Sequence, residues 1–381
     1  MSSLLGLIDM SAAGLEVDND DLAINDLFYR RGWTDGLPII PPTTRRVEEM
    51  LAYCDRPWDQ PVARIAPRYG EATPVRLATN AVMAGCQPEF FPVVVAAIEA
   101  LCEEPFNLYG LQATTHLVSP LIIVNGPIAS ELGINSGYNA LGSGCKSNAT
   151  IGRAVRLSLV NIGGAQSGAG DMATFGSPAK YSYLAAENEA DSPWEPLHVE
   201  RGFAPQASTV TVIGAECPHN VNDHQSVTGA GILKMIAGTM ATTGNNDVYN
   251  LEPHPAIVIG PEHARTIAAD GFSKQEVKRY IFEHAVLPLQ RFSRENIDRR
   301  FLVTYKERYG DANSNVPVPM VQRPEDILVV VIGGPGKHSA VIPSFGVTVP
   351  ITREIKLVNG RAAGSVEEFK HSSGASKACG G

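Results

Sequence analysis

The chain has 381 residues, of which 44% are hydrophobic and 19% charged, and this is a globular composition. Its 31 Lys and Arg against 40 Asp and Glu give a net charge of −9, and no basic run occurs, so we expect neither nucleic acid nor an anionic membrane as a partner. No apolar stretch reaches the length of about 18 residues that a membrane span needs. The six cysteines are scattered without a CxxC pair, which is typical of reduced thiols, and the N-terminus lacks the pattern of a cleaved signal, so we expect a cytoplasmic protein.

Residues 1–70 are predicted to form an N-terminal arm. Within it, the segment 33–42 (WTDGLPIIPP) cannot be helical, because turn and proline signals are closely spaced in it. A short helix follows, with its apolar residues on one face. We interpret the extended segment as a strap across the main body. In an alternative interpretation, Asp35 and the backbone near Gly36 border an active site.

Residues 71–359 are predicted to form an α/β catalytic body, and residues 360–381 a flexible tail. Continuous apolar runs that end at glycine and proline indicate buried strands, and apolar residues at helical spacing indicate helices. We therefore expect an α/β fold with a mostly parallel or mixed sheet and helices on both faces. In chain order the pattern predicts a helix over 89–102, a strand over 120–127, a helix over 147–160, a strand over 208–214, a helix over 231–240, a strand over 255–261, a helix capped by Ser273 and Glu276, and a strand over 326–335.

Three of these strands end alike, in IVNGP, IVIGP and VVIGGP. The recurrence indicates an internal pseudo-repeat, with related halves at about 71–206 and 207–359. In open α/β sheets, ligands bind beyond the carboxyl ends of the strands. This rule favours His263 over His254 as a residue near the site, since the two flank the 255–261 strand. It also places His116 at the wrong end of its strand.

The first cluster of reactive side chains follows the 208–214 strand. The stretch ECPHNVNDH brings Cys217, His219 and His224 close together in sequence. Thiolate and imidazole groups bind zinc, iron or nickel, so these three residues are candidate ligands of a divalent transition metal, or they transfer protons. No standard motif such as HExxH is matched. A polar loop whose side chains cap backbone groups is the alternative.

A second cluster, between residues 180 and 202, combines carboxylates with an imidazole and a guanidinium. Glu187 and Glu189 are candidate catalytic groups, because a carboxylate pair in a desolvated pocket keeps one member protonated as an acid and leaves the other as a base. If this stretch is helical, the two side chains point to different faces and only one serves the pocket. His198 is a further catalytic candidate, and Arg201 is a candidate anchor for an anionic substrate. Solvated acidic surface is the alternative.

The third cluster is the glycine-rich stretch GGPGKHS after the 326–335 strand. Glycines let backbone N–H groups converge on an anion, so Lys337 and Ser339 are candidate substrate-binding residues. His338 could act as a second acid or base, or as an oxyanion donor. Neither GxxxxGK[ST] nor GxGxxG spacing is matched, so we predict no nucleotide cofactor. A tight turn is the alternative.

The fourth cluster, NSGYNALGSGCKSN, leads into the 147–160 helix. It contains Asn135 and Tyr138, which are candidate substrate-binding residues. The positive end of the helix dipole would lower the pKa of Cys145, and the charge of Lys146 would add to this effect. An activated thiol is therefore plausible, and an incidental cysteine before a helix is the alternative.

Several stretches together resemble a bacterial, largely actinobacterial, protein family that is associated with UGSC-type (seleno)proteins. They are TDGLPIIPPT, NAVMAGCQPEFFPVVVAAIEAL, LIIVNGP with LGINSGYNALGSG, AENEADSPWEPLHVERGF and GGPGKHSAVIPSFG. The resemblance covers most of residues 30–350. It implies redox or sulfur chemistry and assigns no catalytic residue.

From these patterns we expect a small-molecule enzyme of lyase or hydrolase type, which uses acid–base chemistry on an anionic substrate, with or without a metal. A thiol-dependent redox or sulfur-transfer enzyme that uses Cys145 or Cys217 is the first alternative. A non-catalytic subunit that binds a partner enzyme is the second. A homo-oligomer is left open. The enzyme hypothesis requires that the reactive clusters converge at one rim of the sheet.

Overall fold

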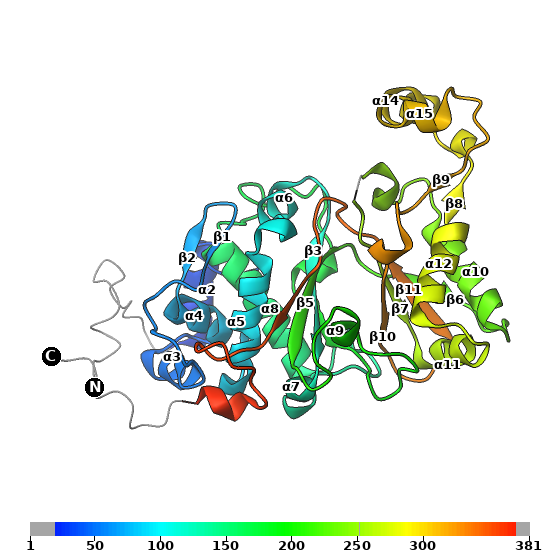
Figure 1. The fold of residues 1–381 in the computed structure, drawn as a ribbon. Coiled ribbons are helices and arrows are strands. Elements are labelled where there is room, and N and C mark those ends of the chain that lie inside the picture. Colours follow the sequence, from blue (N-terminus) through cyan, green and yellow to red (C-terminus); the bar gives the residue numbers. More distant parts are fainter. Residues whose placement is uncertain (1–19, 251, 371–381) are drawn as a thin grey trace.

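Two four-stranded mixed sheets lie face to face between two layers of helices (Figure 1). The computed structural model describes residues 20–250 and 252–370. The first sheet has the order β12 (Ile351–Glu354), β5 (Thr209–Ala215), β3 (Ser119–Asn125) and β4 (Leu184–Ala186). The second has the order β10 (Leu328–Val331), β7 (Ala256–Ile259), β11 (His338–Ile342) and β6 (His219–Asn222). The predicted α/β class and mixed sheet are confirmed.

The central strands β3 and β7 are buried on both faces, which explains their continuous apolar sequences. Successive side chains of a strand point to opposite faces. In β3, Ile122 and Val124 pack under the helices, whereas Leu121 and Ile123 face the other sheet. In β7, Val258 faces the first sheet in the same way. The sheet–sheet interface is therefore a hydrophobic core of its own, between the two cores under the helices.

Helices cover both outer faces of the sheet pair, and each single sheet has helices on one face only (Figure 1). The predicted helical faces are confirmed, because Ile151, Ala154, Val155 and Leu159 of the 147–160 helix are all buried. The layer on the first sheet contains α4 (Pro74–Ala84), α5 (Phe91–Leu101) and α8 (Lys146–Asn161). The layer on the second contains α10 (Gly229–Met240), α11 (Pro261–Ala269) and α12 (Lys274–His284), and α12 has the predicted Ser273–Glu276 capping box.

The two sheets have the same topology. The central strands β3 and β7 each lead through Gly-Pro into a helix, α7 (Pro127–Glu131) or α11. Each central strand pairs in parallel with a later strand, β4 or β10, and antiparallel with another, β5 or β11. The edge strands are exchanged: β6 follows β5 in the chain but pairs with β11, and β12 follows β11 but pairs with β5. The third Gly-Pro match differs, because it leads into β11 and not into a helix.

The predicted boundary between the halves needs a correction. A boundary near residue 206 would assign β5 to the second half, although β5 pairs with β3 along the whole of its length. The elements α5, β3, β4 and β5 of the first half are equivalent to α10, β7, β10 and β11 of the second half. The first half therefore ends with β6, and the second half begins with α10. The boundary follows from the pairing of strands that lie far apart in the sequence. Local sequence patterns do not reveal this pairing.

The N-terminal region is more compact than the predicted arm. In its described part, α2 (Asp21–Arg30) and α3 (Thr44–Leu51) flank an extended segment, and β1 (Ala63–Ile65) pairs with β2 (Gly70–Ala72). Val47, Met50 and Leu51 of α3 are buried in the first hydrophobic core. The extended strap over 33–42 agrees with the prediction, but the residues around it pack as part of the body.

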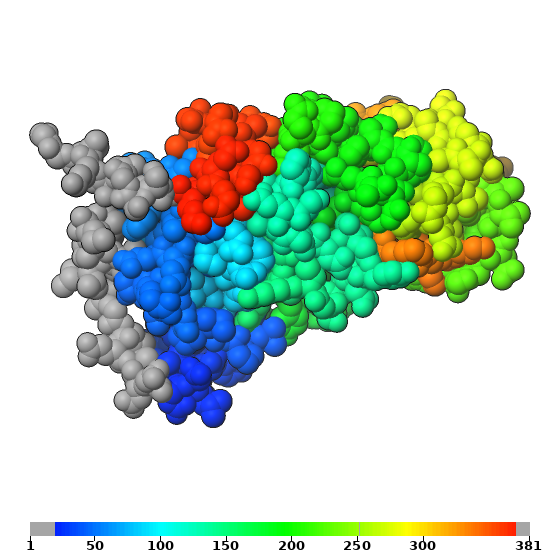
Figure 2. All heavy atoms as spheres, turned by 90° about the horizontal axis from the view of Figure 1, so that it is seen from below, coloured from blue at the N-terminus to red at the C-terminus, as the bar shows by residue number. Residues whose placement is uncertain are grey.

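Residues 360–370 pack against the body, so the prediction of a flexible tail is wrong for them. Phe369 is buried in the first core, and the Tyr53 hydroxyl donates to Glu367 Oε1 at 3.1 Å. Ser365 Oγ donates to Glu131 Oε1 at 2.6 Å. Figure 2 shows this segment, in red, beside blue atoms of the N-terminal region. Residues 371–381 lie outside the described part of the chain.

A smaller lobe projects from the second half at the far end of the molecule (Figure 1). Its stem is the pair β8 (Val286–Leu287) and β9 (Val318–Pro319), and it carries α13 (Arg294–Asn296), α14 (Leu302–Thr304) and α15 (Lys306–Tyr309). Among residues 20–250 and 252–370, no helix combines the length and the apolarity that crossing a bilayer requires.

Candidate functional site

An open cavity of about 880 Å³ lies beside α9 (Leu197–Glu200). This volume is within the range of small-molecule sites. Segments that precede β7, β10 and β12 form part of the wall, so the cavity lies at the amino ends of β7 and β10. The strand-end rule, by which ligands bind beyond the carboxyl ends of the strands, predicts the opposite end. The polar side chains in the wall are Glu200, Arg201, His254, Gln275, Lys278, Arg279 and Glu325.

Arg201, like Arg279, is a cation of this wall that forms no ion pair with a carboxylate among the described residues. One of its Nη2 N–H groups donates to the Pro350 carbonyl at 2.7 Å, and this bond fixes the side chain at the cavity. A guanidinium has five N–H donors, so most of its hydrogen-bonding capacity remains for a ligand. From the sequence, Arg201 is a candidate anchor for an anionic substrate, and its position in this wall is compatible with that role.

Glu200 holds two lysines on the inner side of the same wall. Lys274 Nζ lies 3.0 Å from Glu200 Oε2, and Lys278 Nζ contacts Glu200 Oε1. Burial alone would raise the pKa of Glu200, but the two ammonium groups outweigh it and lower that pKa. One carboxylate with two ammonium groups carries a net positive charge. Together with Arg201 and Arg279, this group outweighs the carboxylate of Glu325, so the charge around the cavity is positive and favours an anion.

His254 lies in the same wall. From the sequence, His263 at the other end of the strand is the residue expected near the site. Burial lowers the pKa of its imidazole; Asp326 opposes this effect and Arg201 adds to it. The ring is therefore neutral near pH 7 and can accept a proton. Its backbone N–H donates to Ser344 Oγ at 2.9 Å, and Ser344 Oγ donates to the buried Asp247 at 2.7 Å. A single histidine before a strand gives no sequence signal for this position.

Glu187 and Glu189 converge, and both accept structural hydrogen bonds, whereas Glu187 Oε1 is buried without a hydrogen-bond partner among the described residues. Asn125 Nδ2 donates to Glu187 Oε2 at 2.7 Å and to Glu189 Oε1 at 2.9 Å. The backbone N–H of Gly126 donates to Glu189, and that of Leu197 to Glu187. Burial raises the pKa of Glu187, and the charge of Glu189 adds to the increase. The stretch continues from β4 and is not helical, so both carboxylates point to one place and tie β4 to β3 and α9.

The first and third clusters meet through the ladder between β6 and β11. His224 Nε2 lies 3.3 Å from His338 Nε2, and Lys337 Nζ donates to the His224 carbonyl at 3.3 Å. Ser339 is buried and hydrogen-bonds to His263 Nδ1 at 2.8 Å, so it is not available to a ligand in this arrangement. His219 lies on β6 opposite Val341, apart from the pair.

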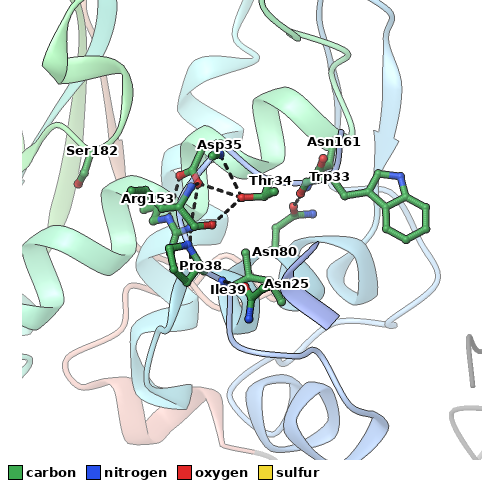
Figure 3. Close-up of polar contacts among 12 residues, drawn as sticks. Asn25, Trp33, Thr34, Asp35, Pro38, Ile39, Asn80, Arg153, Asn161 and Ser182 are labelled. Atoms are coloured by element: carbon green, nitrogen blue, oxygen red, sulfur yellow. Dashed lines mark hydrogen bonds and ion pairs between the residues drawn. The ribbon is translucent and has the colours of Figure 1, made fainter. Parts of the chain in front are cut away.

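Cys217 lies elsewhere, in the wall of a cavity of about 1030 Å³ that Asp35 and Asp171 also line. Asp171 accepts hydrogen bonds from Arg156 and Lys180, so its charge is compensated. Asp35 borders this cavity, and the alternative interpretation that it borders an active site stays a prediction. Its carboxylate, however, forms a two-fold ion pair with Arg153 at 2.8 Å for each contact, which holds the strap on α8 (Figure 3).

The fourth cluster forms a compact loop before α8. Asn148 Nδ2 donates to the Asn135 carbonyl at 2.9 Å, and the ring of Tyr138 packs directly on Gly334 of the third cluster. Cys145 Sγ lies 3.1 Å from Ser147 Oγ. Burial alone would raise the pKa of the Cys145 thiol, but hydrogen bonds from the Asn148 backbone and the Ser147 side chain outweigh it and lower that pKa.

The predicted convergence of all clusters at one rim is wrong. Glu187 bonds to Asn125 and Leu197, His338 to His224, and Cys217 lines a third, separate place. His198 is buried, with Nε2 3.3 Å from the Pro205 carbonyl. Within the described ranges, no three His, Cys, Asp or Glu side chains gather as metal ligands, so Cys217, His219 and His224 are not brought together.

A scan against protein-family models finds none that matches the chain. A search of curated proteins also finds no match.

Proposed function

We propose that the protein is a small-molecule enzyme of lyase or hydrolase type, and that its substrate is an anion bound in the 880 Å³ cavity beside α9. One observation carries the proposal. A guanidinium without a carboxylate partner among the described residues, that of Arg201, lies in the same wall as a neutral imidazole, that of His254. An anchor for negative charge and a group that can accept a proton are the minimum that acid–base chemistry on an anion needs.

Arg201 would bind the carboxylate or phosphate of the substrate. Its planar fork of donors matches two oxygens of such a group, and Lys278 and Arg279 raise the local positive potential. The hydrogen bond to Pro350 limits the motion of the side chain, so less entropy is lost when the ligand binds.

His254 would act as the base. In a lyase it would take the proton next to the anionic group while the leaving group departs; in a hydrolase it would take a proton from water. The imidazolium formed would then return the proton to the leaving group. The chain from Asp247 through Ser344 to the His254 backbone would keep the ring at its place in the wall.

Anion binding tests the first part of the proposal. Calorimetric titration with inorganic phosphate and with succinate should show binding to the wild type and at least tenfold weaker binding to Arg201→Gln. Arg46→Gln is a matched control, because Arg46 also donates to one backbone carbonyl and has no ion pair among the described residues. Equal binding by wild type and Arg201→Gln would remove the anchor from the proposal.

Turnover tests the second part. The wild type, His254→Gln, Arg201→Gln and the control Arg46→Gln are each incubated with a bacterial metabolite extract, and the anionic components are followed by mass spectrometry. We expect at least one anion to be consumed by the wild type and by Arg46→Gln but not by His254→Gln or Arg201→Gln. A metabolite that all four proteins consume equally would contradict the assigned roles, and an inert wild type would favour the non-catalytic subunit.

A thiol-dependent redox or sulfur-transfer enzyme is the second candidate, and Cys145 favours it. Burial raises the pKa of Cys54 to about 11 and those of Cys86 and Cys102 to about 12, whereas that of Cys145 is lowered by its hydrogen bonds. Only the thiolate is a nucleophile, so Cys145 should be the most reactive of these four thiols. The resemblance to UGSC-type (seleno)proteins would fit this candidate.

Alkylation tests the second candidate. Iodoacetamide at pH 7 should label Cys145 at least tenfold faster than Cys54, Cys86 and Cys102, as measured by peptide mass spectrometry. Ser147→Ala should slow the labelling, since it removes one hydrogen bond to the sulfur. If the four thiols react at similar rates, this candidate fails.

The five cysteines of the described ranges are all free thiols, and this supports a reducing compartment such as the cytoplasm.

A further inference from the structure

Two exposed imidazoles meet at the edge of the second sheet. His224 follows the edge strand β6, and His338 opens β11, which pairs with β6. Their Nε2 atoms lie 3.3 Å apart, their ring centroids lie 5.0 Å apart, and the ring planes are 80° from each other. Neither ring takes part in the cavity beside α9, so the pair is a separate feature of the surface.

The two distances fit chelation of one metal ion. A tetrahedral ion at about 2.05 Å from each nitrogen holds its two ligand nitrogens about 3.3 Å apart and the ring centroids about 5.2 Å apart. A straight N–H···N hydrogen bond of the same length would separate the centroids by about 5.6 Å. The observed 5.0 Å is closer to the value for chelation than to the value for a straight hydrogen bond.

Asn220 gives His338 the tautomer that a metal ligand needs. His338 Nδ1 lies 3.0 Å from Asn220 Oδ1, and an amide oxygen can only accept, so Nδ1 carries the proton. The Nε2 atom of the neutral ring then presents its lone pair to His224. A hydrogen bond from the second ring nitrogen to a neighbouring oxygen is the usual support of a metal-binding histidine.

We propose that His224 and His338 bind one divalent transition-metal ion, such as Zn²⁺, through their Nε2 atoms. Imidazole suits zinc, copper and nickel, and two neutral rings do not suit Mg²⁺ or Ca²⁺. No third His, Cys, Asp or Glu of the described ranges joins the pair, so water or a ligand oxygen completes the coordination. With two protein ligands, the ion is exchangeable and its other positions are open.

Calorimetric titration of the full chain with ZnCl₂ at pH 7.5 tests the assignment. We expect one site with a dissociation constant in the micromolar range, at least tenfold weaker binding in His224→Ala and in His338→Ala, and weaker binding in Asn220→Ala by about tenfold. His219→Ala is the matched control, because His219 is exposed on the same strand but apart from the pair. The substituted side chains are all exposed, so the fold should be kept, and circular dichroism checks this.

Three results would overturn the assignment. The first is no zinc binding by the wild type up to 1 mM, which would leave a hydrogen bond between the rings as the whole explanation of their contact. The second is equal binding by the wild type, His224→Ala and His338→Ala, which would place the zinc on other groups. The third is an equal loss in His219→Ala, which would show that the effect is not specific to the pair.

Discussion

Replacing Asp247 by asparagine should make the protein more stable at alkaline pH and remove part of the pH dependence of its unfolding. Asp247 is fully buried in the short helix η5 (Asn246–Tyr249), and its Oδ1 accepts from the Ser344 N–H at 2.9 Å and from Ser344 Oγ at 2.7 Å. Its Oδ2 atom is buried without a hydrogen-bond partner in the described part of the chain. Burial raises the pKa of Asp247 to about 7; the hydrogen bonds from Ser344 oppose this and the charge of Glu216 adds to it.

The sign follows from the raised pKa. The folded state keeps the Asp247 proton up to about pH 7, whereas the unfolded chain loses it near the ordinary value of 3.8. The contribution to stability is therefore complete below about pH 4 and is lost as the pH rises through 7. About three pKa units correspond to about 4 kcal/mol in total, of which about 3 kcal/mol falls between pH 5 and pH 8.

Urea unfolding at pH 5 and pH 8 measures the effect. Asparagine keeps the acceptor for Ser344 but places an NH₂ group where Oδ2 has no partner, which costs about 1–3 kcal/mol at either pH. The free energy of unfolding of Asp247→Asn minus that of the wild type should thus rise by about 3 kcal/mol from pH 5 to pH 8. Asp59→Asn, at an exposed carboxylate, should show no such change. A constant difference for Asp247→Asn would refute the assignment of a buried, shifted carboxyl.

Two further substitutions should lower the free energy of urea unfolding by mechanisms that the structure specifies. Asp35→Asn leaves the Arg153 guanidinium without its charged partner in a buried pair, since the side chains of Arg153 and Asp35 are only 13% and 6% exposed, and we expect a loss of about 3 kcal/mol. Asp26→Asn, in an exposed pair, is the control and should lose less than about 0.5 kcal/mol. Equal losses in the two variants would contradict the prediction. Gly126→Ala places a Cβ 2.2 Å from the Ala207 carbonyl oxygen, at a backbone φ of +85°, and we expect it to lower the free energy of unfolding by at least about 3 kcal/mol. Gly238→Ala, in open space on α10, is the control and should raise the free energy of unfolding by about 0.5–1 kcal/mol. A stable Gly126→Ala protein would show that the backbone there is free to move.

Local patterns predicted the helices and strands well, because local forces determine them. The face of α8 was predictable from apolar spacing alone, and the N-terminus of α12 from a serine three residues before a glutamate. The burial of β3 and β10 was predictable from their uninterrupted apolar sequence. These features depend on residues within one or two turns of each other.

The partner of each buried strand could not be predicted in this way. A continuous apolar sequence indicates that both faces of a strand are covered. It does not indicate whether helices or a second sheet cover them. Here one face of β3 meets helices and the other meets β7 and β10. The stacked sheets also explain why the strand-end rule fails for the cavity beside α9, since that rule describes one open sheet with helices on both faces.

The exchange of edge strands explains where both proposed sites lie. The histidine pair exists because β6, which belongs to the first half in sequence, pairs with β11 of the second half. The anchor of the cavity depends on the reciprocal exchange, because Arg201 of the first half donates to Pro350, the residue before β12. Neither half alone would contain a complete site. A chain cut between His224 and α10 should therefore lose zinc binding and anion binding together and recover both when the two fragments reassociate.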